Sequence, residues 1–154
     1  MYRQFASKEE LYEAVVARLD GIRARLTASS ASVDPTERIR MLAVAYAAHF
    51  LESPQFFPMW ATGKLNRDWG LKSRVSKSLD RRFAEAERQV AGTIEAAVEK
   101  GVLRPLGTPL LTTVAIGIFM SVIQHHLLRA KSRDAEACVA EMLELFFRGA
   151  GQRA

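Results

Sequence analysis

The sequence contains little cysteine, proline or glycine. Its 154 residues include 1 cysteine, 5 prolines and 9 glycines. The single cysteine, Cys138, excludes a disulfide bond within the chain, and this favours a reducing, intracellular compartment. Because helix-breaking residues are few, long segments rich in Ala, Leu, Arg and Glu are free to form helices.

Signals for secretion and catalysis are also lacking. Residues 1–10 carry charges and no apolar core stretch, so we expect no signal peptide. There is no nucleophile elbow, Walker loop or His-Glu-x-x-His spacing. His125 and His126 are adjacent on a predicted helix, where their side chains point about 100° apart and cannot easily share a metal ion. We therefore expect no catalytic residues, no bound metal and no cofactor.

The composition is that of an ordinary globular domain. Apolar residues make up 49% and charged residues 25% of the chain, which is long enough for one domain with its own core. The net charge is +5, and part of the excess lies in one segment. The basic residues of this segment are Lys64, Arg67, Lys72, Arg74, Lys77, Arg81 and Arg82. The segment either binds nucleic acid or another anion, or forms a solvated helix face.

Apolar residues recur at steps of three and four along nearly the whole chain, which predicts helices. Ser7 and Glu10 form a capping box before the first helix, and residues 27–33 read as a loop. Asp34-Pro35 and Ser53-Pro54 begin the next two helices. A long helix over residues 71–100 ends at Gly101. A further helix covers residues 109–130, and Ser132 is the N-cap of the last helix. The pattern predicts an all-α fold, a bundle of about six helices.

Residues 106–128 carry no charge and are long enough to cross a bilayer. Polar residues interrupt this stretch, and no aromatic or basic belt flanks it on both sides. We therefore predict a fully buried helix, and no membrane partner.

The opening residues resemble a specific junction in a known family. Tyr2, Phe5, Lys8, Glu10 and Leu11 fill the pattern Tyr-x-x-Phe, two residues, Lys, then an acid before Leu. This pattern resembles the end of the recognition helix and the start of the next helix in TetR/AcrR-family transcriptional regulators. The turn at residues 99–105 is similar to one that precedes the last two helices in that family.

The resemblance implies that residues 1–6 are the tail of the DNA-recognition helix. Residues 7–154 would then form the effector-binding and dimerisation domain of a cytoplasmic TetR-like regulator, expected to be a repressor. The rest of the helix-turn-helix is missing from this sequence, so we expect no sequence-specific DNA binding without a full-length parent. Only phosphate contacts by Tyr2, Arg3 and Lys8 are expected, unless these residues merely begin a capped helix.

Two origins of Met1 remain open: an internal methionine taken as a start codon, or the boundary of a truncated product. The alternative function is a stand-alone helical protein that binds a small molecule or a partner and has no DNA role. The reading frame upstream of Met1 distinguishes the two functions.

The aromatic residues after Pro54 are either core or the wall of a ligand cavity. Apolar walls with few polar groups suit small organic molecules, and in the resembling family the effector pocket lies within the helical bundle. We predict a cavity for a small, largely apolar organic effector. Its candidate residues are Met41, His49, Phe57, Trp60, Phe83, Met120 and Gln124.

The last two helices predict a homodimer. The uncharged helix over residues 109–130 is apolar on all sides, so we expect a second copy of the chain to cover the face that the bundle leaves exposed. The alternative is that this helix packs entirely within the monomer. Small residues every four positions permit close helix approach, and the final helix adds apolar mass. In the resembling family, such helices form a four-helix interface. The candidate interface residues are Thr113, Gly117, Ser121, Met142 and Phe146.

Overall fold

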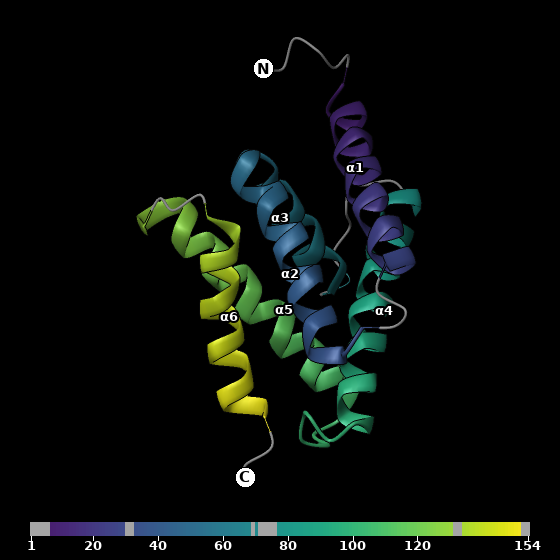
Figure 1. Ribbon diagram of the computed structural model, residues 1–154. Helices are drawn as coiled ribbons and strands as arrows, with labels where there is room; N and C mark the ends of the chain where they lie inside the picture. The colour runs from purple at the N-terminus through teal and green to yellow at the C-terminus, as the bar shows by residue number, and fades with distance from the viewer. Residues whose placement is uncertain (1–6, 30–32, 69, 71–76, 131–133, 152–154) are drawn as a thin grey trace.

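The computed structural model describes residues 7–29, 33–68, 70, 77–130 and 134–151 (Figure 1). Within these ranges the chain forms six α-helices and a short π-helical segment, η2 (His126–Ala130), that continues the fifth. The helices are α1 (Lys8–Ser29), α2 (Pro35–Glu52), α3 (Phe56–Asp68), α4 (Lys77–Glu99), α5 (Thr108–His125) and α6 (Ala135–Ala150). The prediction of an all-α bundle of about six helices is confirmed.

The predicted helix starts follow from local hydrogen bonding. The Asp34 side chain accepts hydrogen bonds from the backbone N–H groups of Thr36 (3.0 Å) and Glu37 (3.4 Å), and Pro35 occupies the first helical position. The Ser7 hydroxyl accepts from the Glu10 N–H at 3.1 Å. Each cap satisfies N–H groups that have no partner within the helix. These two predicted N-caps are confirmed.

Three helix boundaries differ from the prediction. Helix α1 continues to Ser29 through the start of the predicted loop, and there the Thr27 hydroxyl accepts a hydrogen bond from the Gln89 side chain of α4 at 2.9 Å. Helix α3 begins at Phe56 and not directly after Ser53, because Ser53-Pro54 forms a turn in which the Phe56 and Phe57 N–H groups donate to the Ser53 (3.1 Å) and Pro54 (3.2 Å) carbonyl oxygens. The N-cap of α6 is Asp134, which accepts from the Ala137 N–H at 3.2 Å, whereas the predicted cap Ser132 lies outside the described residues.

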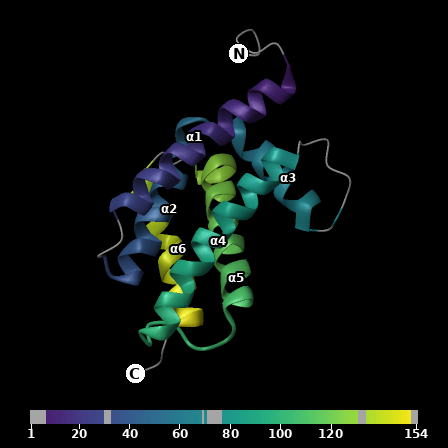
Figure 2. The same cartoon turned by 90° about the vertical axis from the view of Figure 1, so that its right-hand side faces the viewer.

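The helices pack around α2 and α5. Helix α2 contacts α1, α4, α5 and α6, while α5 also contacts α4 and α6. In Figure 1, α6 lies on the left of α2, α1 and α4 lie on its right, and α5 runs obliquely from the lower right to the upper left. Figure 2 shows α4 in front of α5, with α1 running obliquely across the upper part of the bundle. One core cluster surrounds Phe50 and a second surrounds Phe146.

Helix α5 is only partly buried. By length and composition the segment Thr108–Arg129 could cross a membrane, a test that the core helix of a soluble protein also passes. One face packs into the bundle through Leu111, Phe119 and Ile123, whereas Leu110 and Val114 are 56% and 40% exposed. The prediction of a fully buried helix is wrong, because α2, α4 and α6 cover one side of α5 only.

Candidate functional site: a cavity inside the bundle

A cavity of about 110 Å³ lies between the helices, and all six of them contribute to its walls. We call it the central cavity. Its apolar and aromatic lining residues are Leu19, Ile39, Leu42, Ala43, Tyr46, Trp60, Phe83, Ala86, Val90, Ile94, Ala115, Ile116, Phe119 and Met142. Its remaining lining residues are Asp20, Lys64, Arg82, Glu87 and Thr93.

Small side chains on three helices leave this space open. Ala43 on α2, Ala86 on α4 and Ala115 on α5 line the cavity beside bulky neighbours such as Phe83 and Phe119. Protein interiors are otherwise closely packed, so a group of alanines among large residues produces a void that the neighbouring side chains do not fill. The cavity thus results from the placement of small residues on the apolar faces of α2, α4 and α5.

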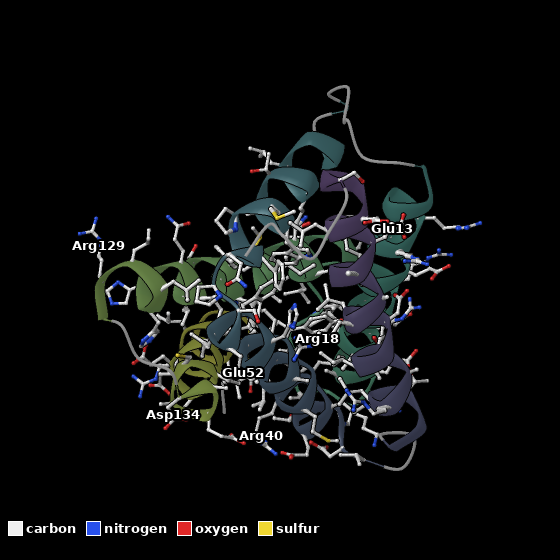
Figure 3. The ribbon with its side chains drawn as sticks, turned by 90° about the horizontal axis from the view of Figure 1, so that it is seen from above. Glu13, Arg18, Arg40, Glu52, Arg129 and Asp134 are labelled. Atoms are coloured by element: carbon white, nitrogen blue, oxygen red, sulfur yellow. The ribbon has the colours of Figure 1, made fainter. Side chains whose placement is uncertain are left out.

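Charged residues gather where α1, α3 and α4 meet at the cavity. The Lys64 ammonium lies 3.0 Å from a Glu87 carboxylate oxygen, which joins α3 to α4. Arg82 of α4 pairs with two acidic residues of α1, Glu13 at 3.0 Å and Asp20 at 3.4 Å. Figure 3 shows Glu13 between α1 and α4. These pairs give the largely apolar cavity one polar side that can orient a ligand.

Arg23 and Tyr46 extend this polar side. Arg23 pairs with Glu85 of α4 at 3.1 Å and lies 3.6 Å from Asp20 on its own helix. Burial raises the pKa of the Tyr46 phenol; nearby Arg23 lowers this pKa and Asp20 raises it. Tyr46 therefore stays neutral at physiological pH and keeps its O–H as a hydrogen-bond donor.

Two of the predicted ligand-binding residues, Trp60 and Phe83, line the central cavity. Phe57 is buried in an aromatic cluster behind the wall, with its ring centroid 5.4 Å from Phe50 and 6.2 Å from Trp60. The aromatic segment is therefore both core and cavity wall.

The other predicted ligand-binding residues are not brought together there. Gln124 is exposed on α5, Met120 packs against the Phe50 cluster, and Met41 is half-buried outside the lining. His49 lines a separate pocket on another face of α2. Among the residues that line the central cavity, the sequence analysis missed chiefly Lys64 and the alanines. For Ala86, the regular spacing of apolar residues along α4 was a signal that could have identified it.

The predicted interface residues divide into two groups. Thr113, Gly117 and Ser121 are exposed on α5, on the side that also exposes Leu110 and Val114. In contrast, Met142 and Phe146 are 4% and 1% exposed and belong to the core of their own chain. The large apolar residue that α6 exposes is Leu145, at 59%.

Little of the predicted anion-binding surface can be placed. Tyr2 and Arg3 lie outside the described residues, and Lys8 is the first residue of α1. Within the basic segment, Lys72 and Arg74 lie outside the described ranges, while Lys64 and Arg82 pair with acidic residues. In the described part of the chain, no group of three or more His, Cys, Asp or Glu side chains is arranged to hold a metal ion.

Sequence comparison finds no match, either to models of known protein families or to curated proteins. Solved structures do match. PfmR, a TetR-family transcriptional regulator from Thermus thermophilus, is 25% identical with a TM-score of 0.69, over 99% of this chain and 81% of PfmR. A proposed fatty acid metabolism regulator from Clostridium perfringens is 23% identical with a TM-score of 0.71, over 99% of this chain and 81% of that one.

The fatty acid degradation regulator FadR from Bacillus halodurans is 17% identical with a TM-score of 0.61, over 96% of this chain and 79% of FadR. These similarities extend over nearly all of the chain, including the six helices that enclose the central cavity. The chain therefore has the fold of the TetR-family transcriptional regulators.

Proposed function

We propose that this chain is the effector-sensing and dimerisation part of a TetR-like transcriptional repressor that acts in the cytoplasm. The central cavity is the observation that carries the proposal, because its walls come from all six α-helices of the described residues. A molecule bound there contacts Leu19 and Asp20 of α1, the helix that follows the expected DNA-recognition segment. A ligand that prefers one position of α1 shifts the protein toward that position.

The proposed effector is a small, largely apolar organic molecule with one polar end. Its apolar part would lie along Val90, Ile94 and Ala115, and its polar end would face Lys64 and Arg82. Two of the similar structures are named for fatty acid metabolism or degradation, which supports a fatty-acid-derived effector. The cavity, at about 110 Å³, is smaller than the roughly 300–1,000 Å³ of typical ligand pockets. Binding would therefore move the surrounding side chains or helices.

Dimerisation is proposed through the exposed apolar face of α5. This face combines Leu110 and Val114 with the small residues Thr113, Gly117 and Ser121, and Leu145 of α6 adds to it. Small residues allow two helices to approach closely, and a two-fold axis is the commonest way to pair identical surfaces. A second copy would cover the apolar side of α5 that the monomer leaves exposed.

Thermal unfolding with saturated fatty acids of increasing length tests the effector proposal. Ligand binding to the folded chain raises its melting temperature, so at least one chain length should stabilise the wild-type protein. Ala86→Leu places three additional carbon atoms in the cavity and should abolish this increase. Ala24→Leu makes the same change at an exposed position of α1 and should leave it intact. Equal stabilisation of both variants, or none of the wild type, would contradict the proposal.

The DNA role is tested on the parent gene. A reading frame that continues upstream of Met1 and encodes a helix-turn-helix supports a regulator, whereas a nearby in-frame stop codon supports the alternative without a DNA role. In a gel-shift competition at physiological salt, the 154-residue chain should not prefer any operator over random DNA. Contacts to phosphate alone would give weak binding that falls steeply with added salt.

A further inference from the structure

A second pocket, of about 360 Å³, lies between α1 and α2. We call it the outer pocket, because no residue of α3, α4, α5 or α6 lines it among the described residues. Helix α1 contributes Ile22 and Leu26 as apolar walls, and two alanines of α2 extend this apolar surface. It shares no lining residue with the central cavity.

His49 of α2 lines the outer pocket with an imidazole whose polar atoms lack partners. Its side chain is buried, at 3% exposure, and neither ring nitrogen forms a hydrogen bond with any described residue. The Phe56 ring stacks on it, with centroids 6.0 Å apart and planes 7° from parallel. Leaving buried polar atoms unpaired is costly, so these nitrogens need a polar partner from outside the chain, a water molecule or a ligand group.

The charges around His49 favour an anion. Arg18 and Arg25 line the pocket from α1, while Glu52 of α2 is the only acidic lining residue in the described part of the chain. Figure 3 shows Arg18 in the space between α1 and α2, with Glu52 on α2. The lining therefore carries two positive charges against one negative charge, and a guanidinium group matches the planar geometry of a carboxylate.

The protonation state of His49 complements this arrangement. Burial lowers the pKa of His49, Arg18 lowers it further, and Glu52 raises it. Near neutral pH the ring is uncharged and offers one N–H donor and one nitrogen acceptor. An incoming carboxylate oxygen can accept the N–H while its second oxygen binds Arg18.

We propose that the outer pocket is a binding site for a small organic carboxylate, separate from the central cavity. The carboxylate would bind Arg18 and the N–H of His49, and its apolar body would pack against Ile22 and Leu26. An inorganic anion leaves those apolar walls uncovered, and a neutral molecule offers no negative charge to the Arg18 guanidinium. The occupied pocket joins α1 to α2 through one ligand.

Benzoate is a suitable probe, and NMR reports on each site separately. Ring-nitrogen signals of His49 monitor the outer pocket, and the indole N–H signal of Trp60 monitors the central cavity. Benzoate should shift the His49 signals in a saturable manner. Arg18→Gln, at an exposed position, should weaken binding roughly tenfold or more, the usual effect of losing a charged hydrogen-bond partner. The matched control Arg88→Gln, at an exposed position of α4, should bind as the wild type does.

Several outcomes would overturn the proposal. Benzyl alcohol binding as tightly as benzoate would show an apolar site without anion recognition. Inorganic phosphate binding equally well would show that the apolar walls contribute nothing. Shifts confined to Trp60 would place benzoate in the central cavity, and the absence of any saturable shift of His49 would leave water as the partner of its ring. Failure of the fatty acid experiment, in contrast, leaves these His49 measurements unaffected.

Discussion

Replacing Gly117 with leucine tests whether the exposed face of α5 is a contact between two copies. Gly117 lies in the middle of α5, and a Cβ built there meets nothing within 4 Å. A single chain therefore accommodates the larger residue. Because glycine is a poor helix former, the folded monomer should gain about 0.5–1 kcal/mol of stability.

The dimer should respond in the opposite direction. Overpacking a close helix contact costs roughly 1–3 kcal/mol, and two-fold symmetry introduces the change twice. The expected loss is roughly 2–6 kcal/mol of association free energy, which corresponds to an increase of more than tenfold in the dimer dissociation constant. Thus one substitution stabilises the chain and weakens its assembly.

Sedimentation velocity over a range of protein concentrations measures the association, and urea unfolding measures the stability. Gly92→Leu is the matched control, since Gly92 is exposed on α4 and its Cβ also meets nothing within 4 Å. We expect this control to form dimers as the wild type does. A Gly117→Leu variant that associates normally would refute the reasoning, as would a wild-type chain that is monomeric at micromolar concentration.

Three further predictions concern stability. Asp34→Ala removes the acceptor for two backbone N–H groups and should lower the free energy of unfolding by about 1 kcal/mol, measured with urea; no change would mean that water replaces the cap. Phe50→Ala empties a fully buried site beside Phe57 and Trp60 and should cost about 3–5 kcal/mol by the same measurement, whereas a loss below about 1 kcal/mol would contradict the packing. Burial lowers the pKa of His49, so its imidazole binds a proton more readily in the unfolded chain than in the folded one. The free energy of unfolding should therefore fall as the pH drops below about 6.5. Unfolding curves of His49→Phe should lack that part of the pH dependence, and an unchanged dependence would exclude His49 as its source.

Most of the helical architecture can be predicted from the sequence because its signals are local. Asp34 and Ser7 accept hydrogen bonds from N–H groups two or three residues away, so their roles depend on short segments only. Gly101 has a φ of 73°, a backbone conformation that favours glycine and follows the end of α4. Such features form with the same geometry wherever the helix packs.

The candidate sites depend on contacts between helices, which periodicity alone does not specify. The stripe of α6 indicates an apolar face but not its rotation, and only packing against α2 and α5 decides that Phe146 is buried while Leu145 is exposed. Likewise, Ala86 and Ala115 carry no chemical signal, yet their small volumes open the central cavity once α4 and α5 meet. The sequence by itself determined where helices begin and which residue types they carry, because those interactions span a few residues. The tertiary structure decided that Trp60 and Phe83 share a cavity while His49 faces another pocket with Arg18, because this depends on how distant helices turn toward one another.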